Sequence, residues 1–225
     1  MFVRIQKLLS DDNLRQVDEL VASGKFLDGK ATAGTPTKRL KNNLQLDLDS
    51  HPKKEEFVEL ITKVMNSHPS VRSAAVPRHM TVPIISKYEK GMFYGWHIDN
   101  PIIQAFGRPV RTDVSCTIFL HESASYDGGE LVVRSLTGDV KIKLDRGDAI
   151  VYPSSYYHQV AEVTRGERLA IIFWMQSMIA DIGKRELLYD LEMAYNQIRK
   201  DNPNSEAIRM IQRAQSYLVR RWSEV

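Results

Sequence analysis

The heptapeptide Phe-Tyr-Gly-Trp-His-Ile-Asp at residues 93–99 decides which fold and which chemistry are expected of this chain. It is rich in aromatic residues and follows a turn signal at Gly91, which favours a β-strand. Side chains two positions apart on a strand point to the same face, so this strand would direct His97 and Asp99 toward one point. A His-x-Asp pair is short enough to occur by chance, and it needs structural context to carry a function.

That context is a second histidine, His158, with Arg168 ten residues after it. Two imidazoles and one carboxylate are the ligands of the facial Fe(II) site, which occupies one face of an octahedral ion and leaves the opposite positions open. Mn or Zn could occupy the same ligands, because site affinity alone does not select iron. We therefore expect His97, Asp99 and His158 to form a metal site; the alternative is a hydrogen-bonded polar cluster inside a barrel.

Composition narrows the class of protein. A length of 225 residues with 43% hydrophobic content fits one large domain, or one domain with an appendage. The net charge of +3, without a basic stripe, predicts no nucleic-acid partner. No run of 18 apolar residues and no signal-like N-terminus occur, which predicts a cytoplasmic protein without a membrane partner. A single cysteine, Cys116, excludes an intrachain disulfide and a cysteine-based zinc site.

Short β-type runs separated by turn residues dominate the chain from residue 80 onward. Eight such runs cover 80–86, 92–98, 114–120, 130–134, 140–144, 149–152, 157–163 and 169–175. This spacing predicts a closed or two-sheet all-β architecture. Turn residues at 137–139, 146–148 and 165–167 predict hairpins. The segment 100–113 is predicted as a structureless loop that acts as a lid over the substrate.

Helical patterns flank these runs. Ser10 resembles a helix N-cap before apolar residues at helical spacing, and Gly24 would end that helix. A second helix is predicted over residues 53–66, and two more after residue 177 form a helical hairpin.

Eight strands, with one ligand pair on the second and a lone histidine on the seventh, resemble the double-stranded β-helix of Fe(II)/2-oxoglutarate-dependent dioxygenases. Within that superfamily the chain resembles the prolyl and lysyl hydroxylase branch and, more closely, the PKHD-type hydroxylases. The segments that carry the resemblance are residues 32–34 (Thr-Ala-Gly), 41–46 (Lys-Asn-Asn-Leu-Gln-Leu), 88–91 (Tyr-Glu-Lys-Gly), 97–99, 128–131 (Gly-Gly-Glu-Leu) and 158–168.

The resemblance implies a mainly β fold with flanking helices: a jelly-roll core plus a C-terminal helical hairpin. Residues 1–177 would be the dioxygenase domain, with helical support at 1–79 and the barrel at 80–177. Residues 178–225 would form the hairpin.

The resemblance also implies the cofactors. Fe(II) would bind His97, Asp99 and His158, and Arg168 would hold the distal carboxylate of the cosubstrate 2-oxoglutarate in a bidentate pair. The activity implied is hydroxylation of an unactivated C–H bond of an unidentified substrate by O₂, with conversion of 2-oxoglutarate to succinate and CO₂. L-ascorbate is implied as an accessory reductant, and the PKHD-type resemblance points to iron metabolism.

Some residues have two interpretations at this stage. Tyr88 lies nine residues before His97, where related hydroxylases place a phenol on the cosubstrate, but a core aromatic residue fits equally. Asn43 and Gln45 would share one strand face, either exposed to solvent or at a polar active-site rim. The other four histidines, His51, His68, His79 and His121, are expected at the surface.

Two functions of other classes compete with a hydroxylase. A non-catalytic metal-binding barrel, acting as an iron sensor or iron-handling module, would keep the three metal ligands without needing Arg168. A partner-binding protein would use the C-terminal helices, through which a homo-oligomer could also form. Arg168 argues against both.

The strands that carry His158 and Arg168 are predicted to form a hairpin. Both side chains face the barrel interior only if the connection has an odd length or a bulge compensates, because a slip of one residue reverses the faces. A three-residue loop at 165–167 satisfies this condition.

Overall fold

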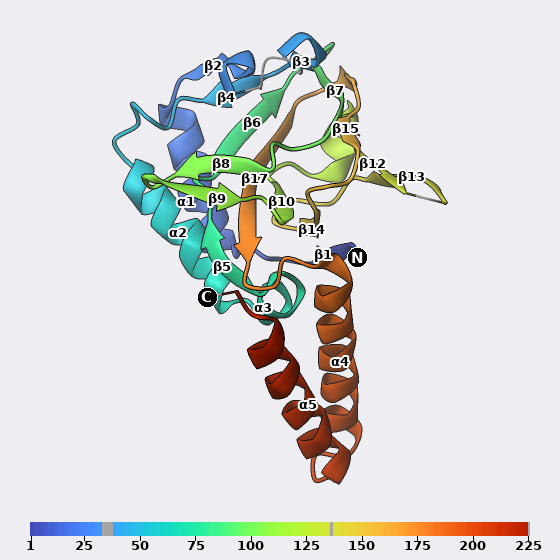
Figure 1. Cartoon of the computed structure of the whole chain (residues 1–225). Helices are drawn as coiled ribbons and strands as arrows, with labels where there is room; N and C mark the ends of the chain where they lie inside the picture. The colour runs from blue at the N-terminus through green and yellow to red at the C-terminus, as the bar shows by residue number, and fades with distance from the viewer. Residues whose placement is uncertain (33–37, 136, 225) are drawn as a thin grey trace.

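Two β-sheets form the body of the molecule, with helices packed outside them (Figure 1). The computed structural model describes residues 1–32, 38–135 and 137–224, so Ala33 and Gly34 of the family-like segments lie outside the described residues. The large sheet has the strand order β1-β14-β10-β17-β6-β4-β2, and β5 also pairs with β17. Its strands are β1 (Val3–Ile5), β2 (Phe26–Asp28), β4 (Leu44–Leu46), β5 (Pro77–Met80), β6 (Ile84–Tyr88), β10 (Val114–Phe119), β14 (Ala149–Pro153) and β17 (Arg168–Ser177).

The small sheet has the strand order β13-β12-β15-β7-β3. Its strands are β3 (Lys41–Asn42), β7 (Phe93–His97), β12 (Leu131–Ser135), β13 (Gly138–Ile142) and β15 (His158–Val160). Two further pairs stand apart: β8 (Ile102–Ala105) with β9 (Arg108–Arg111), and β11 (Asp127–Gly128) with β16 (Val163–Arg165). Short 3₁₀ turns lie at Gly29–Thr32, Lys38–Leu40 and Ser123–Ser125.

The chain alternates between the sheets. Apart from β13, which pairs with β12 in the small sheet, the strands β6, β7, β10, β12, β14, β15 and β17 each lie in the opposite sheet from the one before. This alternation is the connectivity of a jelly roll, in which consecutive strands face each other across the core instead of pairing edge to edge. The predicted mainly β architecture with flanking helices is confirmed, and each of the eight predicted runs has a counterpart strand.

Helices cover the outer face of the large sheet. They are α1 (Asp11–Ser23), α2 (Lys54–Ser67) and α3 (Pro69–Ala75), and Ser10 caps α1 through a capping box with Asn13. Along β10, Cys116 and Ile118 face the main core with the helices, whereas Thr117 faces a cavity between the sheets. Successive side chains of a strand point to opposite faces, so the same strands build the core and the cavity wall.

The chain ends in a helical hairpin, α4 (Ile182–Asp201) and α5 (Glu206–Trp222), that projects away from the sheets (Figure 1). The two helices pack on each other, and α4 also packs on α3. The described residues contain no helix with the length and apolar character needed to cross a bilayer. The predicted helices at 53–66 and after residue 177 are thus present, whereas α3 was not predicted.

Two predicted strands are interrupted. Pro83 separates β5 from β6 where one run over 80–86 was expected, because proline lacks the N–H needed for a central ladder position. The run 157–163 is divided into β15 and β16, which pair with different strands.

The predicted hairpin between His158 and Arg168 is wrong. Strand β16 pairs with β11, β17 pairs with β10, β6 and β5, and only Gly166 and Glu167 connect β16 to β17. The turn at 146–148 likewise joins unpaired strands, β13 and β14, whereas the turn near 137–139 does join the paired strands β12 and β13. Turn residues correctly mark where the chain changes direction. In a jelly roll, however, such a turn can lead to a strand of the other sheet instead of to a paired neighbour.

The segment 100–113 is not structureless. It folds into the β8–β9 hairpin, with Phe106 and Gly107 at positive φ angles of 51° and 74° in the turn. Positive φ angles at both residues of a two-residue loop suit the right-handed twist of the two strands that the loop joins. The hairpin lies in front of the large sheet in Figure 1.

Candidate active site

Three side chains with metal-binding atoms meet where β7 and β15 pair. His97 ends β7, and its direct cross-strand partner is His158, the first residue of β15. Asp99 follows two residues after His97, and its Oδ1 lies 3.9 Å from His97 Nε2 and 3.6 Å from His158 Nε2. The candidate ligand atoms all lie within 4.8 Å of one another, and no other such group occurs among the described residues. The structure therefore brings together the three residues predicted as ligands.

Backbone hydrogen bonds fix both imidazole rings. The Nδ1 atom of His97 lies 2.8 Å from the carbonyl oxygen of Gly95, and that of His158 lies 3.0 Å from the carbonyl oxygen of Tyr156. A carbonyl only accepts, so each Nδ1 donates its proton to it, and Nε2 is the ring nitrogen that faces the cluster. Burial, and then the neighbouring His158, hold the pKa of His97 well below its ordinary value. Two imidazoles and a carboxylate fit a divalent transition metal.

A cavity of about 710 Å³ opens beside these residues. Both sheets line it, the large sheet with Tyr88 and Arg168 and the small sheet with His97 and His158. The β8–β9 hairpin contributes residues 102–104 to its wall. This volume is ample for a small dicarboxylate together with part of a second molecule.

Arg168 lies inside this cavity wall with only 1% of its surface exposed. Its guanidinium lies over the rings of Tyr88 and Phe119, at 5.2 and 5.3 Å from their centroids. Its Nε and Nη1 atoms are buried without a hydrogen-bond partner among the described residues. An uncompensated buried cation is costly, so this arrangement favours an anionic ligand in the cavity.

Tyr88 pairs directly with Arg168 across strands β6 and β17. It is 1% exposed and lines the same cavity. Burial raises the pKa of Tyr88 to about 12, partly offset by the charge of Arg168, so its phenol stays protonated at neutral pH. Tyr88 is thus a buried aromatic residue of the cavity wall, with a protonated phenol that interacts with the Asn43 side chain.

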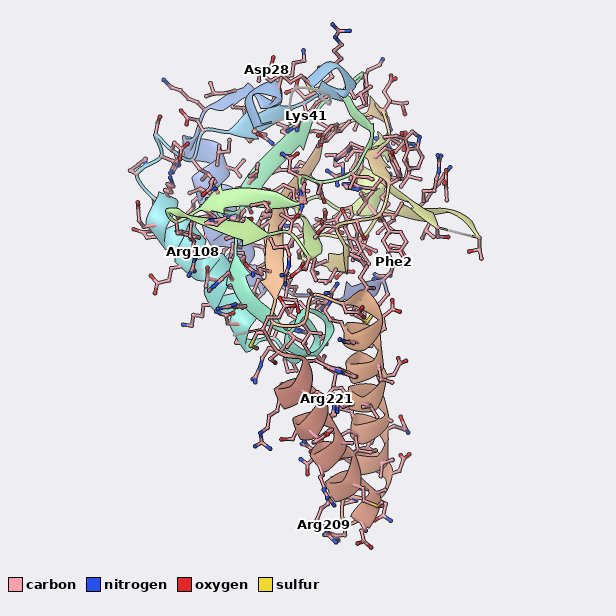
Figure 2. The ribbon with its side chains drawn as sticks, viewed as in Figure 1. Phe2, Asp28, Lys41, Arg108, Arg209 and Arg221 are labelled. Atoms are coloured by element: carbon pink, nitrogen blue, oxygen red, sulfur yellow. The ribbon has the colours of Figure 1, made fainter. Side chains whose placement is uncertain are left out.

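Lys41 was not predicted as a site residue. It is 6% exposed on β3 and lines the cavity, with its Nζ 5.2 Å from the ring centroid of Tyr94. Tyr94 in turn stacks on His97 with ring centroids 3.6 Å apart. Burial lowers the pKa of Lys41 to about 8, against the opposing charges of Asp28 and Asp99. Figure 2 places Lys41 and Asp28 at the same end of the molecule.

Asn43 and Gln45, which follow β3 along the chain, had two interpretations from sequence. Asn43 and Gln45 are buried, at 2% and 8% exposure, and Gln45 lines the cavity, which favours the polar-rim interpretation over solvent exposure. The surface assignment of His51 is wrong, since it is 7% exposed and contacts Ser23 Oγ through Nε2. The sequence signal for the buried position of Asn43 and Gln45 was that these polar residues alternate with leucines.

Comparison with known proteins agrees with this geometry. The model of the 2OG-Fe(II) oxygenase superfamily matches residues 83–176. A PKHD-type hydroxylase of Caulobacter vibrioides is 40% identical over 228 aligned positions, and one of Paracoccus denitrificans is 37% identical over 227. Both alignments cover 100% of this chain and 100% of the relative. This chain belongs to the PKHD-type hydroxylases of that superfamily.

Solved structures share the fold of this hydroxylase. A prolyl-4-hydroxylase of Pseudomonas putida superposes with a TM-score of 0.54 at 17% identity, covering 78% of this chain and 92% of the other. A Trichoplax adhaerens prolyl hydroxylase, solved with a hypoxia inducible factor peptide fragment, superposes with a TM-score of 0.59 at 20% identity, covering 78% and 83%. At these identities the likeness concerns the fold.

The pKa of Lys41 in this hydroxylase is directly measurable. NMR titration of the lysine side chains should show one signal with a midpoint near 8 instead of the ordinary 10.5, and this signal should be missing in Lys41→Arg. Replacing Asp28 with Asn should move the midpoint lower still, because the Asp28 charge stabilises the ammonium. A midpoint at the ordinary value would show that Lys41 is hydrated and not held in the cavity.

Proposed function

We propose that this chain is an Fe(II)- and 2-oxoglutarate-dependent dioxygenase that hydroxylates an unactivated C–H bond. One observation carries the proposal: the His97, Asp99 and His158 cluster shares a cavity with the buried guanidinium of Arg168. A metal site alone does not require a buried arginine without a carboxylate partner. A metal site that also binds a dicarboxylate needs a cation for the carboxylate that lies away from the metal, and Arg168 is such a cation.

Each site residue has a role in this proposal. His97, Asp99 and His158 hold the iron, which together with 2-oxoglutarate supplies the oxidative chemistry when bound. Arg168 pairs with the distal carboxylate of 2-oxoglutarate, and its contacts with two aromatic rings help to hold the guanidinium in place. Tyr88 donates a hydrogen bond to the cosubstrate from its protonated phenol.

The entrance for the primary substrate is assigned to the β8–β9 hairpin. It follows directly on Asp99, lines the cavity, and exposes the apolar side chains of Ile102 and Phe106, each at 59%. An exposed apolar hairpin beside a cavity fits a surface that substrate covers. The lid interpretation is therefore kept, with an ordered hairpin in place of a loop.

Further parts of the proposal rest on resemblance and composition. L-ascorbate is the accessory reductant, and the activity is linked to iron metabolism, with a peptide side chain, a free amino acid or an iron-chelating metabolite as the primary substrate. The single cysteine, Cys116, is consistent with a cytoplasmic location, since no intrachain disulfide can form.

The test is a binding and turnover experiment that needs no primary substrate. Under anaerobic conditions, 2-oxoglutarate is titrated into Fe(II)-loaded protein; O₂ is then admitted and succinate is quantified. Wild-type protein should bind 2-oxoglutarate and form succinate slowly. Arg168→Ala should keep its iron but bind 2-oxoglutarate about 10- to 150-fold more weakly, the loss expected for a charge-assisted hydrogen bond of roughly 1.5–3 kcal/mol.

Arg168→Lys serves as the matched control, because it keeps the charge but loses the bidentate fork, and it should fall between the two. Unchanged 2-oxoglutarate affinity in Arg168→Ala would remove the anchor assignment. Iron binding without any succinate in the wild type would favour a metal-binding barrel without catalysis.

We further propose that the helical hairpin, which sequence assigns to a separate region at 178–225, joins two copies of the chain. It exposes Leu187, Met193, Met210 and Tyr217 at 48%, 39%, 66% and 60%. Helix α5 carries four arginines and one glutamate, and Figure 2 shows two of the arginines, Arg209 and Arg221, on the projecting hairpin. Helix α4 carries the carboxylates Glu186, Asp190 and Glu192, together with Lys184 and Arg185 in its first turns. A second, reversed copy offers matching apolar side chains and carboxylates for these arginines.

Light scattering during size-exclusion chromatography tests this proposal. The wild type should have the mass of a dimer, and Tyr217→Asp should have the mass of a monomer, because a charge cannot be buried in an apolar contact. Ser216→Asp, one residue away and also exposed, should remain dimeric. A monomeric wild type at all concentrations would contradict the proposal and leave the surface to another protein.

A further inference from the structure

The three candidate ligands share a property beyond their spacing. In each of the two histidines, the ring nitrogen that points away from the cluster is held by a backbone carbonyl. Asp99 follows the same rule with a side chain as its partner. The hydroxyl of Ser115 donates to Asp99 Oδ2 at 2.6 Å, whereas Oδ1 is the oxygen that faces both histidines.

The Ser115 hydroxyl is itself held in place. Ser115 is 1% exposed on β10, and Ser154, 2% exposed, follows the neighbouring strand β14. Their Oγ atoms are 2.9 Å apart. An ionised carboxylate only accepts hydrogen bonds, so Asp99 Oδ2 takes the proton of the Ser115 hydroxyl, and Ser154 Oγ lies within hydrogen-bond distance of the same hydroxyl. The two serines form a buried chain that ends on one oxygen of Asp99.

The rigidity of this chain comes from the large sheet. Strands β10 and β14 pair in register, with Ser115 opposite Tyr152. Asp99 lies beyond the end of a small-sheet strand, where the backbone no longer fixes its side chain. The hydrogen bond from Ser115 therefore ties a loop residue of one sheet to a central strand of the other.

We propose that Ser115, supported by Ser154, is a positioning residue that restricts Asp99 to binding the metal through Oδ1 alone. A carboxylate can bind a metal through one oxygen or through both. With Oδ2 engaged by Ser115, only Oδ1 is offered. A facial site depends on this restriction, because a second carboxylate oxygen would occupy one of the positions that must stay open for other ligands.

The inference concerns the metal site on which the proposed function rests, but it can be read without turnover. The probe is Co(II) alone, titrated calorimetrically into metal-free protein and followed by its visible absorption, which responds to coordination number and geometry. The variants are Ser115→Ala, Ser115→Thr, which keeps the hydroxyl, and Ser154→Ala. Ser177→Ala is the control, because it removes a buried serine hydroxyl bonded to Val76 that does not touch Asp99.

Ser115→Ala should bind Co(II) about 10- to 100-fold more weakly, as is typical when the hydrogen-bond partner of a metal ligand is lost. Its absorption spectrum should also shift, because Oδ2 is freed to reach the metal. Ser115→Thr and Ser177→Ala should match the wild type in affinity and spectrum. Ser154→Ala should lose less affinity than Ser115→Ala, because Ser154 acts only through Ser115.

Wild-type affinity and spectrum in folded Ser115→Ala would overturn the proposal. An affinity loss in Ser115→Ala without any spectral shift would also overturn it, since the hydroxyl would then stabilise the cluster without setting how Asp99 binds. If Ser115→Ala does not fold, Ser154→Ala decides by the same two readouts. Failure of the proposed function would show separately, as Co(II) binding that follows these expectations in a protein that forms no succinate.

Discussion

The register between β7 and β15 is the constraint on which the site depends. His97 and His158 are direct cross-strand partners, so their side chains leave the same face of the small sheet. A slip of one residue would turn one imidazole to the opposite face and separate the pair. The register shifts between His158 and Val160, a local irregularity that ends regular pairing just beyond the histidines. The pairing of β7 with β15 is therefore regular at the two histidines and irregular beyond them.

The second constraint is electrostatic and involves the opposite sheet. Arg168 reaches the cavity from the large sheet, while the two histidines reach it from the small sheet. In the proposed complex, the charges of the divalent metal and Arg168 balance those of Asp99 and the dianionic cosubstrate. Each buried charge is costly alone, so the site reaches its low-energy state only when both ligands are present. This explains how Arg168 can stay buried although no carboxylate of the described residues pairs with it.

The sequence was sufficient to predict that His97, Asp99 and His158 lie together, as well as the β architecture and the family, because these depend on local patterns. Strand periodicity predicted His97 and Asp99 on one face, and they do meet, although β7 ends at His97 and Asp99 lies just beyond it; turn residues separate the eight runs. The sequence did not predict which strands pair with one another. The parity argument for Arg168 assumed a hairpin, whereas its strand pairs with β6, β10 and β5, and its interior position follows from crossing between sheets.

Residues that act through tertiary contacts were also missed. Lys41 approaches His97 through Tyr94, from a part of the chain more than fifty residues away. Ser115 and Thr117 left a signal, since they alternate with apolar residues inside a buried strand, but that pattern does not reveal which carboxylate Ser115 meets. The β8–β9 hairpin was missed because Phe106-Gly107 lacks the Asn or Asp that usually marks such turns.

The most direct test of the account is the stoichiometry of anaerobic Fe(II) binding in wild type, His158→Ala and His121→Ala. His121 is a matched control, because its Nδ1 also lies close to a backbone carbonyl, that of Glu167, but it lies outside the cluster. The account predicts one tightly bound Fe(II) per chain in the wild type and in His121→Ala, and loss of that site in His158→Ala. Tight one-to-one binding retained in a folded His158→Ala protein would contradict it.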